Sequence, residues 1–358
     1  MARLLVPLER AGFTIERPLG GLDTAFRATR TFGTGGPRVA LLAEYDALPE
    51  LGHACGHNLI GTAAVGAAIA AAEHLEKLDA DFTLEVVGCP AEEGGGGKIY
   101  LIEAGVFRGV DAALMFHPSH RTMPVRSSLA ATRLTLKFHG KASHAATNPH
   151  LGINALDACI QTFNAINALR QHFPDEYRVH GIISHGGTAP NVVPDFAEAR
   201  FLVRHRHLEQ VALLRDKVVR AAEGAALSVG ARLEVEEGMM LADRISNFPL
   251  AQRFARYLVE QDIELQEPPT VGGVGSSDFG NLSHILPAIH PYVKIAPEGT
   301  SNHTPAFAEA AGSREGLDGM IAAAKALAAT AVDLALEPEL LERAKADFAT
   351  TVPQHKGS

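Results

Sequence analysis

The chain has 358 residues, of which 46% are hydrophobic and 20% charged, and its formal net charge is −9. This composition is typical of a folded globular protein, and the length favours two domains over a single core. A negatively charged chain without a long basic run is a poor partner for nucleic acid. The longest uncharged apolar stretch, Leu59 to Ala72, is shorter than the ~20 residues of a membrane-spanning helix, so we expect no membrane association.

The N-terminus and the cysteines predict a cytoplasmic location. Glu9 and Arg10 stand where a signal peptide needs an apolar core, so no targeting segment is expected. The three cysteines, Cys55, Cys89 and Cys159, are odd in number and widely spaced. A disulfide framework is therefore not expected, and a reducing cytoplasm fits this pattern best.

The first part of the chain alternates apolar strands with a helix. Strands are predicted over Val39 to Ala43, over Thr83 to Cys89 and over Asp111 to Phe116, and a helix capped by Asn58 over Leu59 to Leu78. This order predicts an α/β domain with a mixed, largely parallel sheet. Polar side chains at the strand ends would then lie together, where such sheets usually keep their sites.

The pattern changes near residue 127. Half-exposed strands are expected over 131–140, 197–206 and 231–238, and helices over 154–173 and 208–230. The segment 127–237 therefore predicts a smaller α/β sandwich inserted into the first domain, which would comprise 1–126 and 238–358. A final Ala-rich helix is expected over Leu317 to Leu336.

Cys55 and His57 lie two residues apart, just before the first predicted helix. In an extended strand-to-helix connection both side chains can converge, and a helix N-terminus favours the thiolate over the thiol. Thiolate and imidazole together suit zinc or a similar cation. From this motif alone a metal site is not the only interpretation, because Cys55 could be a core cysteine and His57 a surface histidine.

Glu92 and Glu93 are adjacent at the end of a predicted buried strand. Two neighbouring carboxylates repel each other unless a cation or a proton lies between them. One of them could bind metal while the other serves a bound water as general base, although such a pair can also belong to a solvated loop. The glycines at 94–97 lack the spacing of a phosphate-binding loop, so no nucleotide is expected.

Two further histidines complete a possible ligand set. His117 closes the third predicted strand, and His303 lies in a polar loop before the last helix. Each is weak on its own in a chain with 17 histidines, but together with the earlier residues they form a set of five metal-competent side chains. Five protein ligands can hold two divalent ions if one ligand or a hydroxide bridges them.

Six motifs occur in order over nearly the whole chain: AEYDALPELGHACGHNLIG, CPAEEGGGG, GKASHAATNPHLGINAL, GGTAPNVVPD, GSSDFGNLSHILPAIHP and NHTPAF. As a set they resemble the dinuclear-metal amidohydrolase family, which includes aminoacylases, carboxypeptidase G and the auxin-conjugate hydrolases. The first motif looks closest to the aminoacylase-one-like dipeptidase branch. The resemblance implies two divalent ions per subunit, zinc first with manganese or cobalt as alternatives. It also implies Glu92 as catalytic base, and as metal ligands Cys55, His57, Glu93, His117 and His303.

The resemblance also assigns roles in the inserted domain, which would be a lid that joins two chains into a homodimer. His144 corresponds to a lid histidine that stabilises the tetrahedral intermediate, often across the dimer interface. Asn191 corresponds to an asparagine that contacts the substrate. Asp46 and Asp278 resemble carboxylates that orient site histidines or neighbouring loops.

The predicted activity is that of a metal-dependent amidohydrolase, which cleaves the amide bond of N-acyl amino acids or short dipeptides by a metal-activated water. Two alternatives are a catalytically inactive metal-containing binding protein and a cysteine hydrolase that uses Cys55. His57 is too close in sequence to serve as the base for Cys55 within one rigid turn. Neither alternative gives Glu92 a role.

Overall fold

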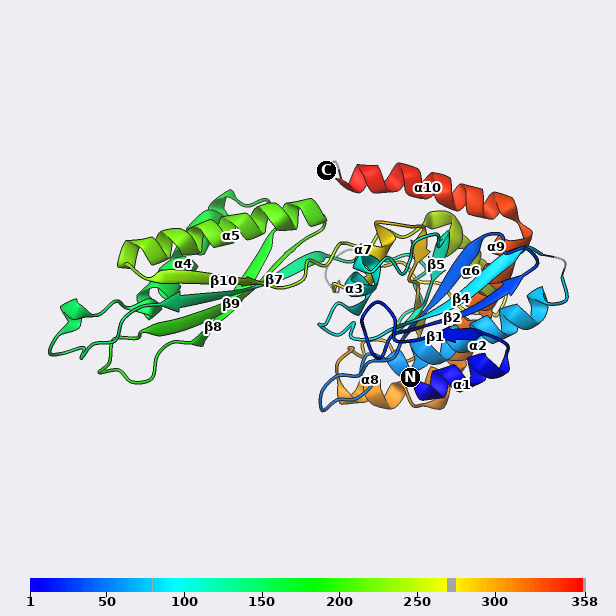
Figure 1. Cartoon of the computed structure of the whole chain (residues 1–358), viewed down its shortest axis with the longest axis horizontal. Helices are drawn as coiled ribbons and strands as arrows, with labels where there is room; N and C mark the ends of the chain where they lie inside the picture. Colours follow the sequence, from blue (N-terminus) through cyan, green and yellow to red (C-terminus); the bar gives the residue numbers. More distant parts are fainter. Residues whose placement is uncertain (79, 269–274, 357–358) are drawn as a thin grey trace. The chain divides into compact units, whose positions relative to one another are not determined.

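The computed structural model of the chain describes residues 1–78, 80–268 and 275–356. The chain forms two compact units, and the second unit, Ser128–Asp243, is inserted between Met1–Ser127 and the chain from Arg244 onward. In Figure 1 the blue and cyan beginning of the chain and its yellow-to-red end build the first unit, while the green middle builds the second. The chain returns to the first unit at Arg244, a few residues beyond the expected boundary at 237.

A six-stranded sheet, in the order β1-β2-β4-β3-β5-β11, forms the centre of the first unit. The strands from β4 to β11 run parallel, whereas β1 and β2 are antiparallel at one edge. The mixed, largely parallel sheet predicted from the sequence is therefore confirmed. A separate parallel pair joins β12 to β6. The strands are β1 Thr14–Glu16, β2 Phe26–Phe32, β3 Arg38–Glu44, β4 Phe82–Cys89, β5 Ala112–Leu114, β6 His117–Ser119, β11 Ala288–Ile289 and β12 Tyr292–Lys294.

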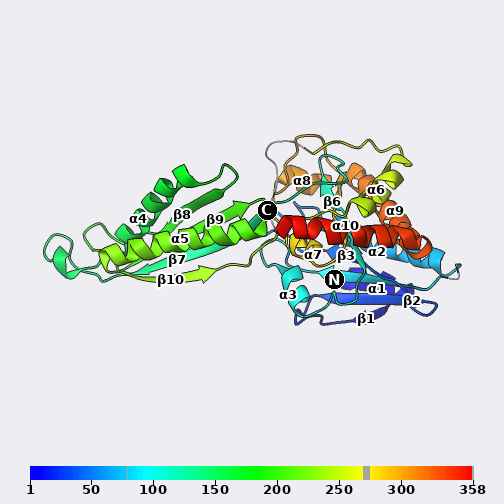
Figure 2. The same cartoon turned by 90° about the horizontal axis from the view of Figure 1, so that it is seen from above.

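Helices pack around this sheet through small apolar side chains. The Ala-rich helix α2 contacts β3 and β4, and α9 packs against α2 and β3 (Figure 2). The helices are α1 Ala2–Arg10, α2 His57–Leu75, α3 Gly97–Glu103, α6 Phe248–Val259, α7 Phe279–Ser283, α8 Pro305–Ala310, α9 Arg314–Leu336 and α10 Pro338–Lys356. By length and hydropathy alone α2 and α9 could cross a membrane, which differs from the expectation drawn from Leu59 to Ala72. Both helices contribute buried residues to the core of the first unit.

The second unit is a four-stranded antiparallel sheet, in the order β10-β7-β9-β8, with helices α4 and α5 packed on one face. Three of its strands and both helices match the expected segments, but strand β8 was not predicted. Only Val179 of β8 is buried, so the alternation that marks a half-buried strand is missing there. The elements are β7 Ala130–His139, η1 Pro149–Leu151, α4 Ala155–Leu169, η2 Arg170–His172, β8 Arg178–His185, β9 Phe196–His205, α5 Leu208–Val229 and β10 Arg232–Glu237.

Two local predictions near the strand ends are wrong. Helix α2 begins at His57 with Gly56 as its N-cap, and the Asn58 side chain donates to the Ala311 carbonyl instead of capping the helix. His117 does not end the third strand. It begins β6 after a break, because the chain leaves β5 at Leu114 and turns toward β12.

Candidate metal centre

The five expected metal ligands lie in the first unit, in segments that follow its strands β3, β4, β5 and β12. Cys55 and His57 flank Gly56, which connects the loop after β3 to α2. Gly56 has a φ of 80°, and a Cβ at this position would lie 2.7 Å from Pro118 Cγ. Glycine is therefore required, because any side chain would be strained and would clash. The resulting bend lets the side chains of Cys55 and His57 converge.

The structure brings the candidate ligands together. Cys55 Sγ lies 3.5 Å from His117 Nε2, and His303 Nε2 lies 3.1 Å from Glu93 Oε1. His57 Nε2 is 4.0 Å from one oxygen of Glu93 and 4.0 Å from one of the adjacent Glu92. The donor atoms form three overlapping groups, each within 4.8 Å: Cys55, His57 and His117; Cys55, Glu93 and His303; and His57, Glu92 and Glu93.

Hydrogen bonds orient the histidine rings. His57 Nδ1 lies 3.1 Å from Asp46 Oδ1, and His117 Nδ1 lies 2.7 Å from the Pro118 carbonyl. Both acceptors carry no proton, so Nδ1 donates in each ring, and Nε2 is the nitrogen that faces the cluster and can bind a metal once it carries no proton. The other oxygen of Asp46 accepts from the Glu93 backbone N–H at 3.0 Å. One carboxylate thus fixes residues from two loops, as the sequence resemblance implied for Asp46.

His303 is fixed by its backbone. Its φ of 62° lies in the left-handed region, which is strained for a residue with a Cβ, and its N–H donates to the Ala54 carbonyl at 2.9 Å. That hydrogen bond ties the loop before α8 to the turn that carries Cys55. The strained conformation directs the half-exposed His303 ring at Glu93.

The donor set fits divalent cations. His57 Nε2 and Glu93 Oε1 are buried and have no hydrogen-bond partner within the described residues. Such buried polar atoms are costly unless a ligand satisfies them. Donors bound to a shared ion at about 2.0–2.3 Å lie roughly 3–4 Å from one another, which agrees with the distances in this cluster. The mixture of sulfur, imidazole and carboxylate suits zinc and similar borderline metals.

Burial and local charge set the protonation of the metal-free cluster. Burial, assisted by the charges of Glu93 and Glu92, raises the pKa of the Cys55 thiol to about 12. The expectation that the helix N-terminus favours a thiolate is therefore wrong for the metal-free chain, and a thiolate needs a neighbouring cation. Burial lowers the pKa of His57, but the hydrogen bond to Asp46 and the neighbouring Cys55 outweigh it and raise that pKa to about 12.

Glu92 differs electrostatically from a solvated carboxylate. Burial, together with the negative charges of Glu44 and Asp278, raises the pKa of Glu92 to about 8. A carboxyl group with a pKa near neutrality can both accept and return a proton, as a general acid–base requires. The backbone of Glu93 is tied to Asp46, and its side chain faces His303. The two adjacent glutamates therefore have different surroundings.

A buried ion network behind the cluster was not predicted. Lys98 Nζ lies 2.5 Å from Glu44 Oε1 and 2.6 Å from Asp278 Oδ1, and all three side chains are essentially inaccessible. The second oxygen of Glu44 faces His57 Nε2 at 3.5 Å. Asp278 thus accepts from the ammonium group and the backbone N–H of Lys98, at the start of α3, instead of orienting a site histidine. The sequence holds one signal of this network: Glu44 ends the apolar run RVALLAE. A carboxylate buried at that position needs a partner.

His144 and Asn191 lie close together within the second unit. His144 forms an isolated bridge with Val192, and the Ala145 N–H donates to the Asn191 carbonyl at 3.0 Å. The Nδ1 atom of His144 accepts from the Thr147 N–H at 3.2 Å, so the proton of the neutral ring lies on Nε2. The exposed His144 side chain therefore presents an N–H donor.

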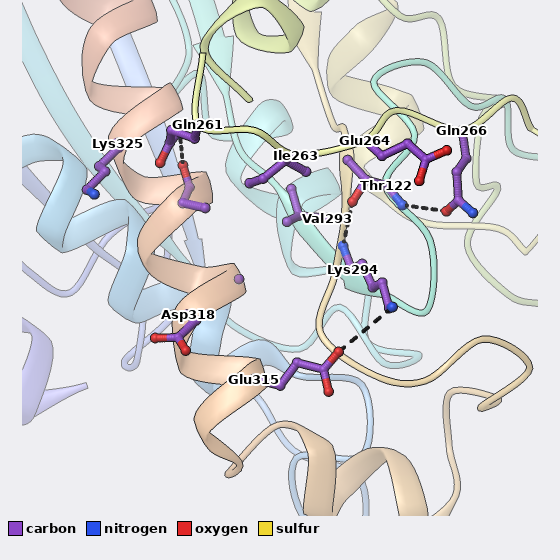
Figure 3. A pocket seen from close by; sticks show the side chains of 12 residues that line it. Thr122, Gln261, Ile263, Glu264, Gln266, Val293, Lys294, Glu315, Asp318 and Lys325 are labelled. Carbon is purple, nitrogen blue, oxygen red and sulfur yellow. Dashed lines mark hydrogen bonds and ion pairs between the residues drawn. The ribbon is translucent and has the colours of Figure 1, made fainter. Parts of the chain in front are cut away.

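A separate hollow of about 690 Å³ lies between α9, β12 and the loop after α6 (Figure 3). Its polar groups bind one another: Gln261 donates to Ala322, Gln266 accepts from the Thr122 N–H, and Lys294 lies 3.9 Å from Glu315. None of the candidate ligands lines it. This hollow is thus distinct from the metal cluster.

Comparison with known proteins identifies the family. Residues 127–229 match the peptidase dimerisation domain of M20 enzymes. The Mus musculus Xaa-Arg dipeptidase is 41% identical over 342 residues, which cover 93% of this chain and 79% of that protein. The chain belongs to the M20 family. One of the subunits of the Escherichia coli p-aminobenzoyl-glutamate hydrolase is 33% identical, with 97% of this chain and 88% of that protein covered.

Solved M20 structures agree on the fold. A Bacillus subtilis protein, described as a dinuclear metal binding peptidase from the M20 family, superposes with a TM-score of 0.69 at 22% identity. The match covers 94% of this chain and 91% of that one. As an M20 member the chain is a metal-dependent amide-bond hydrolase, which confirms the enzyme class expected from the sequence. The cysteine hydrolase and the inactive binding protein are thereby set aside.

Proposed function

We propose that this M20 enzyme holds two divalent ions per subunit and hydrolyses dipeptides or N-acyl amino acids. The observation that carries the proposal is the set of three overlapping donor groups, one of which includes Glu92. Zinc is the first candidate because thiolate and imidazole donors favour it, and manganese or cobalt are alternatives. The proposed ligands are Cys55, His57, Glu93, His117 and His303.

Glu92 is the proposed general base. Bound divalent ions would polarise the scissile carbonyl and make water more acidic. Glu92 would accept a proton from the attacking water and deliver it to the leaving amine. Its raised pKa supports both steps, since the protonated form is then accessible near neutral pH.

His144 is the proposed donor to the oxyanion of the tetrahedral intermediate, and Asn191 a proposed substrate contact. The support for His144 is its exposed ring with the proton on Nε2, since a neutral N–H can stabilise developing negative charge. Asn191 lies on the segment beside His144, so a substrate held by one of these residues would be near the other.

The second unit is the proposed dimer interface. Strand β8 is at the edge of its sheet, so one row of its backbone groups has no neighbouring strand in the described part of the chain. Ile182 and Ile183 on this strand are 62% and 42% exposed. An exposed apolar edge strand is a template for pairing with a second chain. All three cysteines are free, which supports the proposed cytoplasmic location.

A subunit-mixing experiment tests whether His144 acts across such a dimer. Glu92→Gln and His144→Ala chains are each expected to be nearly inactive. If His144 serves the partner's site, a mixed dimer has one site lacking both groups and one intact site. Activity should then recover towards half of the wild-type value per mixed dimer. With subunit exchange verified, no recovery would mean that His144 acts within its own chain or has no catalytic role.

The proposed substrate has a free carboxylate and a cationic C-terminal residue. The relative of 41% identity is named as an Xaa-Arg dipeptidase, and the net charge of −9 favours the approach of cationic over anionic molecules. We expect kcat/KM for alanyl-arginine to exceed that for p-aminobenzoyl-glutamate by about tenfold or more at low salt.

A panel of alanyl-arginine, alanyl-lysine, N-acetyl-arginine and p-aminobenzoyl-glutamate checks this preference in the zinc-, manganese- and cobalt-loaded enzyme. A higher kcat/KM for the glutamate conjugate would contradict the cationic preference but leave the amidohydrolase proposal intact. Failure to hydrolyse any dipeptide or N-acyl amino acid with each metal would contradict the proposed function itself.

A further inference from the structure

Arg244 binds both points at which the chain passes between its two units. The chain leaves the first unit after Ser127 and returns at Arg244. The Arg244 side chain is almost fully buried, at 3% exposure. Its Nε donates to the Arg126 carbonyl at 2.9 Å, and its Nη2 donates to the Ser127 carbonyl at 3.2 Å. One guanidinium group therefore holds the outgoing segment at the position where the returning segment begins.

The same guanidinium group binds two rings. Its Nη1 lies 2.5 Å from His290 Nδ1, and Nη1 and Nη2 lie 3.4 and 3.3 Å from the Tyr292 hydroxyl oxygen. An arginine only donates, so His290 Nδ1 must accept and the ring proton lies on Nε2. Burial, with the charge of Arg244 next, lowers the pKa of His290 well below its usual value, which agrees with a neutral ring.

Both rings pack against His117, a proposed metal ligand. The His290 and His117 ring centroids are 5.2 Å apart with an interplanar angle of 29°, and the Tyr292 ring centroid is also 5.2 Å from that of His117. Tyr292 is the register partner of His117 in the β12–β6 pair. His117 is further held by its hydrogen bond to the Pro118 carbonyl. Its orientation therefore depends on two neighbours that Arg244 holds in place.

We propose that Arg244 is a positioning residue that orients His117 for metal binding through His290 and Tyr292, and that it links this orientation to the two chain crossings. The inference rests on the proposed function, because it takes His117 as a ligand. Arginine suits the role since its planar fork donates in several fixed directions at once, which a lysine ammonium cannot reproduce.

The test compares Arg244→Lys and Arg244→Met with the wild-type protein. We expect both variants to bind Co²⁺ at one of the two sites about 10- to 100-fold more weakly, the usual effect of removing a group that orients a ligand. The visible absorption spectrum of the Co²⁺-loaded protein should change as well. Arg253→Met is the matched control, because Arg253 is a largely buried arginine that pairs with Asp333 and Glu337 away from the cluster. It should leave the spectrum and the affinity unchanged.

A second pair of variants covers the case in which the Arg244 variants fail to fold. His290→Gln keeps an acceptor for Arg244 and an N–H donor, whereas His290→Phe keeps an aromatic ring but offers no acceptor. We expect both variants to lose some packing against His117, and the Phe variant to lose more Co²⁺ affinity than the Gln variant, because only Gln keeps an acceptor for Arg244. Equal behaviour of the two, or folded Arg244 variants with wild-type affinity and spectrum, would overturn the inference.

His117→Ala separates this inference from the proposed function. It should lower Co²⁺ occupancy more than any Arg244 variant. If His117→Ala keeps both ions with an unchanged spectrum, His117 is not a metal ligand. The ligand set of the proposed function is then wrong. If His117→Ala loses metal while the Arg244 variants do not, only the positioning role fails.

Discussion

Glu92→Gln is expected to lower kcat by about 10²- to 10⁴-fold while the bound metal stays in place, because a positioned general base is typically worth that much. Glutamine has nearly the shape of glutamate but cannot take a proton from water. The surroundings of Glu92 favour this role, since burial and the charges of Glu44 and Asp278 raise its pKa to about 8. Steady-state kinetics together with metal analysis of the same sample measure both effects.

Glu93→Gln is the matched comparison, because it makes the same chemical change one residue away. Glu93 Oε1 is buried without a hydrogen-bond partner among the described residues and faces His303 at 3.1 Å. We therefore expect this variant to lose metal occupancy as well as activity. Equal loss of metal in both variants would mean that the roles of the two glutamates are wrongly assigned.

Metal affinity is expected to rise about 100-fold for each unit of pH between roughly pH 6 and 9, because binding releases about two protons. In the metal-free chain the pKa values of Cys55 and His57 are both raised to about 12, so both groups hold a proton throughout this range. A metal ligand must give up that proton. Each released proton makes the apparent affinity tenfold higher per pH unit, so affinity is lost as the pH falls.

Competition with a chelator of known affinity at several pH values gives this slope, and calorimetry in two buffers counts the released protons. Cys55→Ser provides an internal check. Its hydroxyl group does not ionise in this range, so the slope should fall by about one proton. A metal affinity that does not change with pH would contradict the protonation states described for Cys55 and His57.

The sequence predicts the parts of this molecule in which local pattern and tertiary structure agree. Strand β4 is buried along its whole length and reads as an apolar run, and the alternation in β7 matches a strand with one buried face. Strand β8 shows the limit. Its side chains are almost all exposed, so neither burial nor alternation left a signal. The N-cap of α2 was misassigned because a left-handed glycine, not a polar side chain, begins the helix.

The candidate ligands could be proposed from the sequence because four of them lie in the quoted motifs and His117 closes a predicted strand. Of the groups that support them, Asp46 was implied by the resemblance, whereas Lys98 and Arg244 were not predicted because their partners are distant in sequence. Lys98 is paired with Asp278, which is 180 residues away, although a lysine is normally expected at the surface. Arg244 reaches Arg126 and His290, which are 118 and 46 residues away along the chain. Such long-range pairs follow from the fold and not from any local pattern.

Metal content measured in parallel with activity tests the central claim most directly. Purified protein is stripped with a chelator, and zinc is then added back in steps while bound metal and hydrolysis of alanyl-arginine are measured on the same samples. The account predicts no activity in the stripped protein and a return of activity that is complete at two bound ions per chain. A stripped protein that keeps full activity would contradict this account. So would a protein whose activity returns fully without metal bound at the described cluster.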